Sequence, residues 1–112
     1  MNQTWKKRWI AALRGGKYQQ GRGQLRHEGQ HCCLGVLCDI TEPDGWQTVE
    51  QRTEIGDLLI RRQEQHRGHA VMVGPSVAAK AQLDYADEKV LMEMNDGGVP
   101  FDRIADYIEE NL

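Results

Sequence analysis

The feature that most constrains the fold is a short apolar run in an otherwise polar chain. Residues 32–40 read CCLGVLCDI. Four side chains of the run recur at i, i+3, i+4 and i+7, the spacing of one helical face: Cys33, Val36, Leu37 and Ile40. Leu34 and Cys38 widen that face. We therefore expect a short helix that is buried in the core and ends before Pro43.

Length and composition favour one soluble globular domain. The chain has 112 residues, of which 28% are charged and 39% are hydrophobic. No apolar run approaches the roughly 20 residues of a membrane span, so no membrane partner is expected. The basic start, MNQTWKKRWI, is followed by no apolar segment of the kind that a secretory signal needs. We expect a single domain over residues 1–112, located in the cytoplasm.

Two amphipathic helices are expected, one near each end of the chain. The first is capped by Asn2 or Thr4 and ends at the glycine pair of residues 15–16, and its apolar stripe is Trp5, Trp9, Ile10 and Leu13. The second begins at Pro100, a residue type that suits the first helical position. Its apolar stripe is Phe101, Ile104, Ala105 and Ile108.

The middle of the chain predicts a small amount of β structure. Residues 24–33 fit a hairpin whose turn lies at Glu28 and Gly29, and residues 70–73 fit one strand. Residues 48–66 are expected to be helical, because acidic side chains come early in the segment and basic ones come late.

Two short helices are expected after that segment. Ser76 can cap the first, which would reach Leu83, and Asp84 or Asp87 can cap the second. Taken together, these elements predict an α+β fold: a mostly helical single domain with a small antiparallel β-hairpin or sheet.

Charge is divided unevenly along the chain. Residues 1–30 carry seven Lys or Arg and one acid, a net of +6, whereas residues 31–112 carry seven bases and sixteen acids, a net of −9. This division excludes a uniformly basic coat for extended nucleic acid. Near the two chain ends, some charges sit at helix ends that the dipole disfavours: Lys6, Lys7, Arg8, Glu109 and Glu110. We expect the first and last helices to lie together, so that these groups neutralise one another.

Three clustered cysteines predict free, buried thiols. An odd number without a secretion signal is not a disulfide framework. A zinc site is the alternative, made from His27, His31, Cys32, Cys33 and Cys38. The spacing lacks a CxxC pair and the neighbours are apolar, which favours core thiols over a metal. A cysteine nucleophile with a histidine base is also conceivable, but nothing in the sequence fixes such a pair. We predict no catalytic residue, no metal and no cofactor.

The loop after the first helix is the leading binding site. It is rich in glycine and basic residues, so its backbone amides could cradle a phosphate while its arginines grip the oxygens. The predicted ligand-binding residues are Lys17, Tyr18, Gly21, Arg22, Gly23 and Arg26. The alternative is a solvated connection with no ligand.

The acidic C-terminal part suggests a different kind of partner. The last 29 residues hold nine acids: Asp84, Asp87, Glu88, Glu93, Asp96, Asp102, Asp106, Glu109 and Glu110. Such a surface could mimic nucleic-acid phosphates in the basic groove of a host protein. The alternative is that these acids form only the solvated faces of amphipathic helices.

Three sequence blocks resemble a family of small tailed-phage proteins. The blocks are WIAALRGGKYQQG at residues 9–21, CCLGVLCD at residues 32–39, and LMEMND at residues 91–96 followed by Phe101, Ile104, Ala105 and Asp106. The resemblance implies a phage or prophage accessory protein expressed in the cytoplasm of the bacterial host, and it implies no particular chemistry.

Together these observations lead to one expected function and two alternatives. We expect a non-enzymatic counter-defence factor that sequesters a small phosphorylated or nucleotide-like host signal, helped by assembly into a homo-oligomer. One alternative is an acidic inhibitor of a host nuclease or defence enzyme. The other is an enzyme that depends on Cys and His.

Overall fold

Helix α2 (Cys33–Thr41) lies at the centre of the molecule, as its apolar sequence predicts. The computed structural model describes residues 1–52 and 60–112. Every residue from Cys32 to Cys38 is buried. Gly35 is required here, because a Cβ at this position would lie 1.8 Å from the carbonyl oxygen of Leu25. The prediction of a short buried helix is confirmed.

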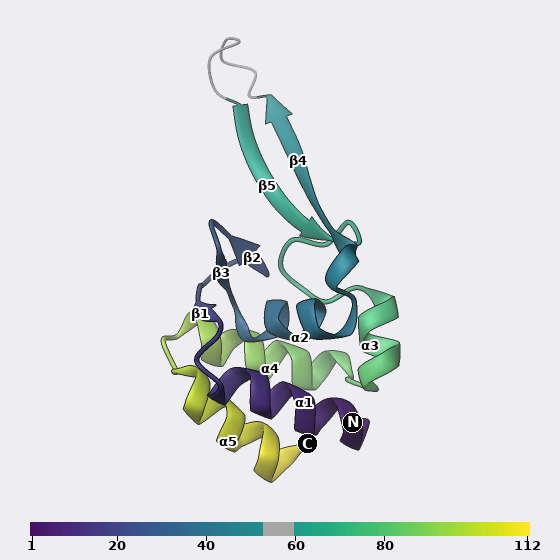
Figure 1. Ribbon diagram of the computed structural model, residues 1–112, viewed down its shortest axis with the longest axis vertical. Helices are drawn as coiled ribbons and strands as arrows, with labels where there is room; N and C mark the ends of the chain where they lie inside the picture. Colours follow the sequence, from purple (N-terminus) through teal and green to yellow (C-terminus); the bar gives the residue numbers. More distant parts are fainter. Residues whose placement is uncertain (53–59) are drawn as a thin grey trace.

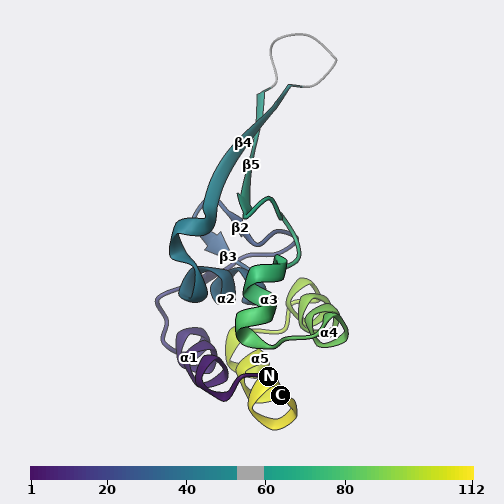
Figure 2. The ribbon, with the colours of Figure 1, turned by 90° about the vertical axis from the view of Figure 1, so that its right-hand side faces the viewer.

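Two terminal helices pack side by side beneath α2. Helix α1 (Gln3–Arg14) runs antiparallel to helix α5 (Phe101–Asn111), and Met1 and Leu112 lie at the same end of the molecule (Figures 1 and 2). The Asn2 side chain caps α1 by accepting a bond from the Trp5 amide. Pro100 is the residue before α5, one position earlier than expected. The predicted adjacency of the first and last helices is thus present.

A small three-stranded sheet lies on the other side of α2. Its strands are β1 (Gln19–Gln20), β2 (Arg26–His27) and β3 (Gln30–His31), in the order β1-β3-β2. Strand β2 pairs antiparallel with β3, and β1 pairs parallel with β3. Both turn residues have positive φ, 49° at Glu28 and 80° at Gly29, as a tight hairpin turn of the primed type needs. The hairpin predicted around these two residues is confirmed.

A long β-hairpin projects from the body as an arm (Figure 1). Strand β4 (Trp46–Arg52) pairs antiparallel with β5 (Ile60–His66), from Trp46 opposite His66 to Arg52 opposite Ile60. The prediction of a helix over residues 48–66 is therefore wrong for the described part of that segment; residues 53–59 lie outside the described residues. Charge order alone is a weak helix signal, and the pairing of β4 with β5 outweighs it.

The strand predicted over residues 70–73 is also absent, and this segment follows a series of bends. The Val73 amide donates to Oε1 of the buried Glu88 at 2.6 Å, so a carboxylate satisfies this backbone group instead of a neighbouring strand. Burial raises the pKa of Glu88, although the bond from Val73 opposes this effect.

Helices α3 (Pro75–Ala81) and α4 (Tyr85–Asp96) complete the body. Asp84 caps α4 by accepting a bond from the Asp87 amide at 2.8 Å, one of the two caps expected. Ser76 is not the cap of α3: Gly74 precedes the helix, Pro75 begins it, and the Ser76 hydroxyl donates to Glu42 instead. These helices and small sheets make an α+β fold, as predicted. In the described residues no helix is long and apolar enough to cross a membrane.

A buried carboxylate joins the base of the arm to the body. Glu42 lies between α2 and the short 3-10 helix η1 (Pro43–Gly45), and 8% of its side chain is exposed. Its carboxylate accepts bonds from Ser76 at 2.8 Å and Arg67 at 3.3 Å and pairs with Lys80 at 3.0 Å. Burial alone would raise the pKa of Glu42, but these partners together lower it to about 2. Glu42 is therefore ionised at neutral pH.

One buried amide connects three distant parts of the chain. Oδ1 of Asn95 accepts bonds from Gln20 Nε2 at 3.0 Å and from the Cys33 amide at 3.1 Å. Its Nδ2 donates to the Gly21 carbonyl at 2.8 Å. Asn95 is fully buried, so water does not reach its amide. These three bonds therefore satisfy polar atoms that would otherwise have no hydrogen-bond partner. Segments 9–21, 32–39 and 91–96 therefore meet at this side chain.

Candidate functional site

The residues of the predicted binding loop divide into two groups. Lys17, Tyr18 and Arg26 lie near the base of the arm. The Tyr18 hydroxyl donates to Asp39 at 2.5 Å, and the Lys17 ammonium lies 5.5 Å from the Tyr18 ring centroid. Arg26 Nε pairs with Glu64 at 2.7 Å, and its guanidinium lies over the Trp46 ring at 4.1 Å.

The other group faces the turn between α4 and α5. The Gly23 amide donates to Asp96 at 2.9 Å, and the Arg22 guanidinium lies against Gly98. The Gly21 amide donates to the His31 carbonyl at 2.8 Å. Both glycine amides that the prediction offers to a phosphate are thus engaged within the protein. The loop prediction remains a prediction, with fewer donors available than the sequence suggests.

A row of four aromatic rings runs between the two parts of the fold. The ring centroids of Tyr18 and His31 are 5.0 Å apart, those of His31 and Trp46 5.8 Å, and those of Trp46 and His66 5.0 Å. All three pairs meet edge to face, which aromatic rings favour. The row bridges the small sheet and the arm. No periodic pattern in the sequence predicts it, because its members come from four separate segments.

His31 is the least satisfied member of this row. Both of its ring nitrogens are buried, and within the described residues neither has a hydrogen-bond partner. Burial lowers its pKa, an effect that the nearby Asp39 carboxylate opposes and the Arg26 charge reinforces. His31 is therefore a neutral packing residue in this arrangement.

The cysteines behave as core residues. Cys32, Cys33 and Cys38 are all free and buried. Burial raises the pKa of each thiol, that of Cys32 to about 11. At neutral pH each sulfur therefore carries a proton, which suits packing and disfavours nucleophilic attack. In the part of the chain that the structure describes, no three His, Cys, Asp or Glu side chains are grouped to hold a metal ion.

Of the nine acidic residues of the C-terminal part, only Glu88 is buried. Five of them have internal partners: Asp84 caps α4, Glu88 holds Val73, Asp96 holds Gly23, and Asp106 and Glu109 bind Arg14. These five acids therefore contribute to the fold, and the phosphate-mimicking surface remains a prediction.

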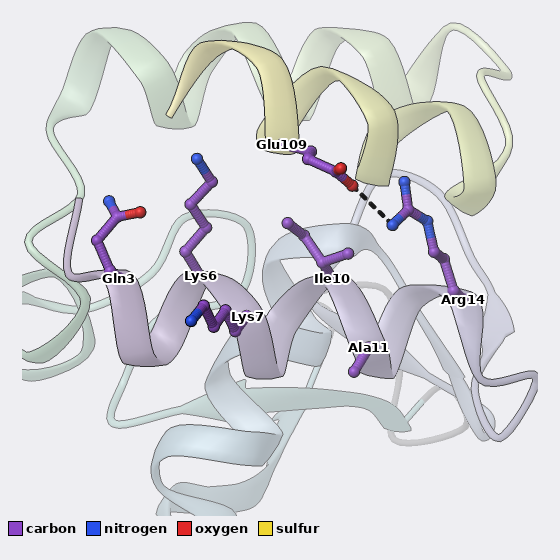
Figure 3. A pocket seen from close by; sticks show the side chains of 7 residues that line it. All are labelled: Gln3, Lys6, Lys7, Ile10, Ala11, Arg14 and Glu109. Atoms are coloured by element: carbon purple, nitrogen blue, oxygen red, sulfur yellow. Dashed lines mark hydrogen bonds and ion pairs between the residues drawn. The ribbon is translucent and has the colours of Figure 1, made fainter.

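A basic groove lies along α1 beside α5 (Figure 3). It has a volume of about 470 Å³ and is lined by Gln3, Lys6, Lys7, Ile10, Ala11, Arg14 and Glu109. Three of these residues are cations and one is a carboxylate, so the lining residues carry a net charge of +2. The volume falls within the range of roughly 300–1,000 Å³ that small-molecule sites occupy.

The three cations of the groove differ in their surroundings: Arg14 is held by carboxylates, whereas Lys6 and Lys7 have no carboxylate partner within the described residues. Arg14 donates to Asp106 at 2.7 Å and to Glu109 at 2.8 Å, and these bonds raise its pKa. Within the described residues, neither Lys6 nor Lys7 forms an ion pair. The expectation that Lys6, Lys7 and Arg8 are neutralised by the last helix is therefore wrong for the described residues, because Arg14 takes the α5 carboxylates instead. Arg8 lies 5.0 Å from the Trp5 ring centroid.

The charges of α1 are visible in the sequence, but no sequence motif assigns them to a site. The useful signal was the placement of Lys6 and Lys7 in the first half of a helix, where the dipole disfavours cations. Because neither lysine is neutralised by the fold within the described residues, they stand out as candidates for an external anion.

Comparison with known proteins places the chain in a family without assigning it an activity. No curated protein and no solved structure matches it. One family model, described as a domain of unknown function, matches residues 1–112. The chain therefore belongs to this family, DUF8296.

Proposed function

We propose that this protein binds a small phosphorylated or nucleotide-like anion in the groove along α1 and releases it unchanged. One observation carries the proposal: Lys6 and Lys7 line a groove of about 470 Å³ and, within the described residues, have no carboxylate partner. Two lysine ammoniums can bind phosphate oxygens by charge-assisted hydrogen bonds, each stronger than a bond between neutral groups.

The rest of the groove suits such a ligand. Ile10 and Ala11 offer apolar surface on which a base or sugar ring can lie. Arg14 is held in place by Asp106 and Glu109, so its position costs little ordering when a ligand binds. Gln3 adds an amide that can donate or accept a hydrogen bond at the end of the groove.

Binding without turnover is supported by the state of the chemically reactive groups. The three thiols are buried and protonated at neutral pH, and in the described part of the chain no cysteine lines the groove. Among the described residues, no histidine lines the groove either, so it holds no imidazole that could act as a general base. These features favour sequestration over catalysis.

The resemblance to small tailed-phage proteins suggests where sequestration is useful. In an infected bacterial cell, a protein that holds a nucleotide-like host signal lowers its free concentration and so blunts the response that the signal triggers. We include this counter-defence role in the proposal, together with expression in the bacterial cytoplasm.

The experiment is a binding screen by thermal unfolding and calorimetry. Inorganic phosphate, pyrophosphate, linear nucleotides and cyclic nucleotides serve as probes. A ligand at about 100 times its Kd stabilises the folded state by about 2.7 kcal/mol, which raises Tm by roughly 10 °C for a domain of this size. Mass spectrometry of the recovered probe then tests whether it is unchanged.

Variants separate the groove from the loop. We expect the double variant Lys6→Ala/Lys7→Ala to weaken binding at least tenfold, whereas the matched control Lys89→Ala on α4 leaves it unchanged. Arg22→Ala tests the loop in the same screen. If Arg22→Ala abolishes binding and the lysine variant does not, the groove is not the site. If no probe raises Tm, or if the probe is converted, the proposed function is wrong.

A further inference from the structure

The arm presents an open strand edge. The Arg67 amide donates to the Gly45 carbonyl at 2.9 Å, one step before the pair of Trp46 and His66. Antiparallel pairs alternate between hydrogen-bonded and non-hydrogen-bonded positions. The backbone N–H and C=O groups of Gln47 and Val49 are therefore hydrogen-bonded to β5. Those of Thr48 and Glu50 point away from β5.

The two edges of the arm differ in what covers them. Strand β5 is tied to the body: Glu64 pairs with Arg26 at 2.7 Å and accepts a bond from the Glu28 amide at 3.1 Å. The His66 amide, which also points away from β4, donates to the His69 carbonyl at 2.8 Å. Strand β4 pairs with β5 alone within the described residues, so its outer edge has no partner there.

The outer edge has little of the usual protection against pairing, with Glu50 and Arg52 as the only charged residues among the seven of β4. Natural edge strands are commonly blocked by proline, lysine or a bulge. Residues 46–52 contain no proline and no lysine, and all seven pair with β5 in unbroken register. A two-stranded ribbon is only marginally stable in water, and a further strand stabilises it.

We propose that the outer edge of β4 pairs with β4 of a second copy of this chain, antiparallel, about a two-fold axis at Val49. This register overlaps all seven residues, Trp46–Arg52, of each strand. It places Thr48 opposite Glu50 of the partner, so the outward N–H and C=O groups of one strand face those of the other. The two arms then form a four-stranded sheet.

Charge and overlap together favour this register and a second copy as the occupant, because only an axis at Val49 overlaps all seven residues of β4. An axis at Glu50 would place two identical carboxylates opposite each other, which is destabilising. An axis at Val49 instead places each Glu50 opposite a threonine, and the Arg62 partner of Glu50, at 3.5 Å, lies on the same sheet. This register therefore overlaps the full length of the strand without placing two carboxylates opposite each other.

The proposed interface is independent of the groove. The arm and the pair α1 and α5 lie at opposite ends of the long axis, along which the molecule extends 50 Å (Figure 1). A dimer formed through the arms leaves both grooves open, so one assembly presents two copies of the groove.

Hydrogen exchange of the wild-type protein tests the pairing directly. In the dimer, the amides of Thr48 and Glu50 become bonded, so we expect their exchange to slow at least tenfold between dilute and concentrated solution. The amides of Gln47 and Val49 bond β5 in either state and change little. If Thr48 and Glu50 exchange at the same rate at every concentration, the pairing does not exist.

A matched pair of variants tests the same edge by sedimentation. Thr48→Pro removes an outward amide without removing a bond to β5, and Thr48→Val keeps the amide. We expect the wild type and Thr48→Val to shift from monomer to dimer with concentration, and Thr48→Pro to weaken the dimer at least tenfold. A wild type that stays monomeric, or a Thr48→Pro variant that dimerises equally well, overturns the proposal.

Discussion

The buried carboxylate of Glu42 makes the stability of this protein depend on pH in a defined range. Its pKa is about 2 in the folded state against 4.5 as the ordinary value. A group with a lowered folded pKa stabilises the fold above its unfolded pKa, and the contribution disappears as the pH falls towards the folded value. The Glu42 contribution is therefore complete above about pH 5 and is lost between roughly pH 4.5 and pH 2.

The size of the effect follows from the same shift. The change in the Glu42 pKa from 4.5 to about 2 corresponds to about 3 kcal/mol at neutral pH. The cationic partners Arg67 and Lys80 are each 50% exposed, so solvent screens part of the attraction. We expect Glu42→Gln to lower the free energy of unfolding by roughly 2–3 kcal/mol at pH 7.

Urea denaturation at a series of pH values measures this contribution, because urea does not screen charge as guanidinium does. Wild type and Glu42→Gln should differ most at pH 7 and converge as the pH falls through 4 and 3. Glu93→Gln, which removes an exposed carboxylate from α4, is the control. A cost below about 0.5 kcal/mol at pH 7, or a cost that stays constant down to pH 3, would refute the reasoning.

Three further predictions concern the core. Gly35→Ala should destabilise the fold by about 3 kcal/mol or more in urea titrations, since the new Cβ would overlap the Leu25 carbonyl and α2 would have to shift; a variant as stable as wild type would show that the packing is looser than described. Asn95→Ala should cost about 3 kcal/mol in the same assay, because it leaves the Cys33 amide and the Gly21 carbonyl buried without a partner. All three thiols should resist a thiol-specific reagent at pH 8 in the native protein and react once it is unfolded; rapid labelling of native protein would contradict their burial.

The parts of the fold that the sequence predicts correctly are those set by local pattern. The apolar spacing of α2, the cap of α1 at Asn2 and the Glu28-Gly29 turn all depend on neighbours within a few residues. Such signals are visible in one sequence, because the interactions that they describe are short-range.

The arm was missed because its stability comes from pairing between distant segments. The two strands of the arm show no regular alternation of apolar and polar residues. Most of the arm stands clear of the core, so it has no buried face that would require one. Acidic residues come early and basic residues late in residues 48–66, an order that is also typical of a helix. In the structure, however, Glu50 and Arg62 lie opposite each other on paired strands.

The groove was missed for a similar reason. It needs α1 and α5 to be placed side by side, and its one internal ion pair joins Arg14 to Glu109, 95 positions further along the chain. The sequence showed that the first and last helices carry charges at unfavourable ends. It could not show that Arg14 would take the carboxylates and leave Lys6 and Lys7 without them in the described structure.

The antiparallel packing of α1 and α5 has a mechanical consequence. Because Met1 and Leu112 lie at the same end of the molecule, a load applied between them acts across this helix pair in an unzipping geometry. Contacts then break one turn at a time, beginning at Gln3 and reaching Arg14 last. Such a load would open the lysine-lined groove as α1 peels away. At Trp9 it would also break the bond from the indole to the Cys33 carbonyl of α2, so release of a bound ligand would coincide with the first opening of the core.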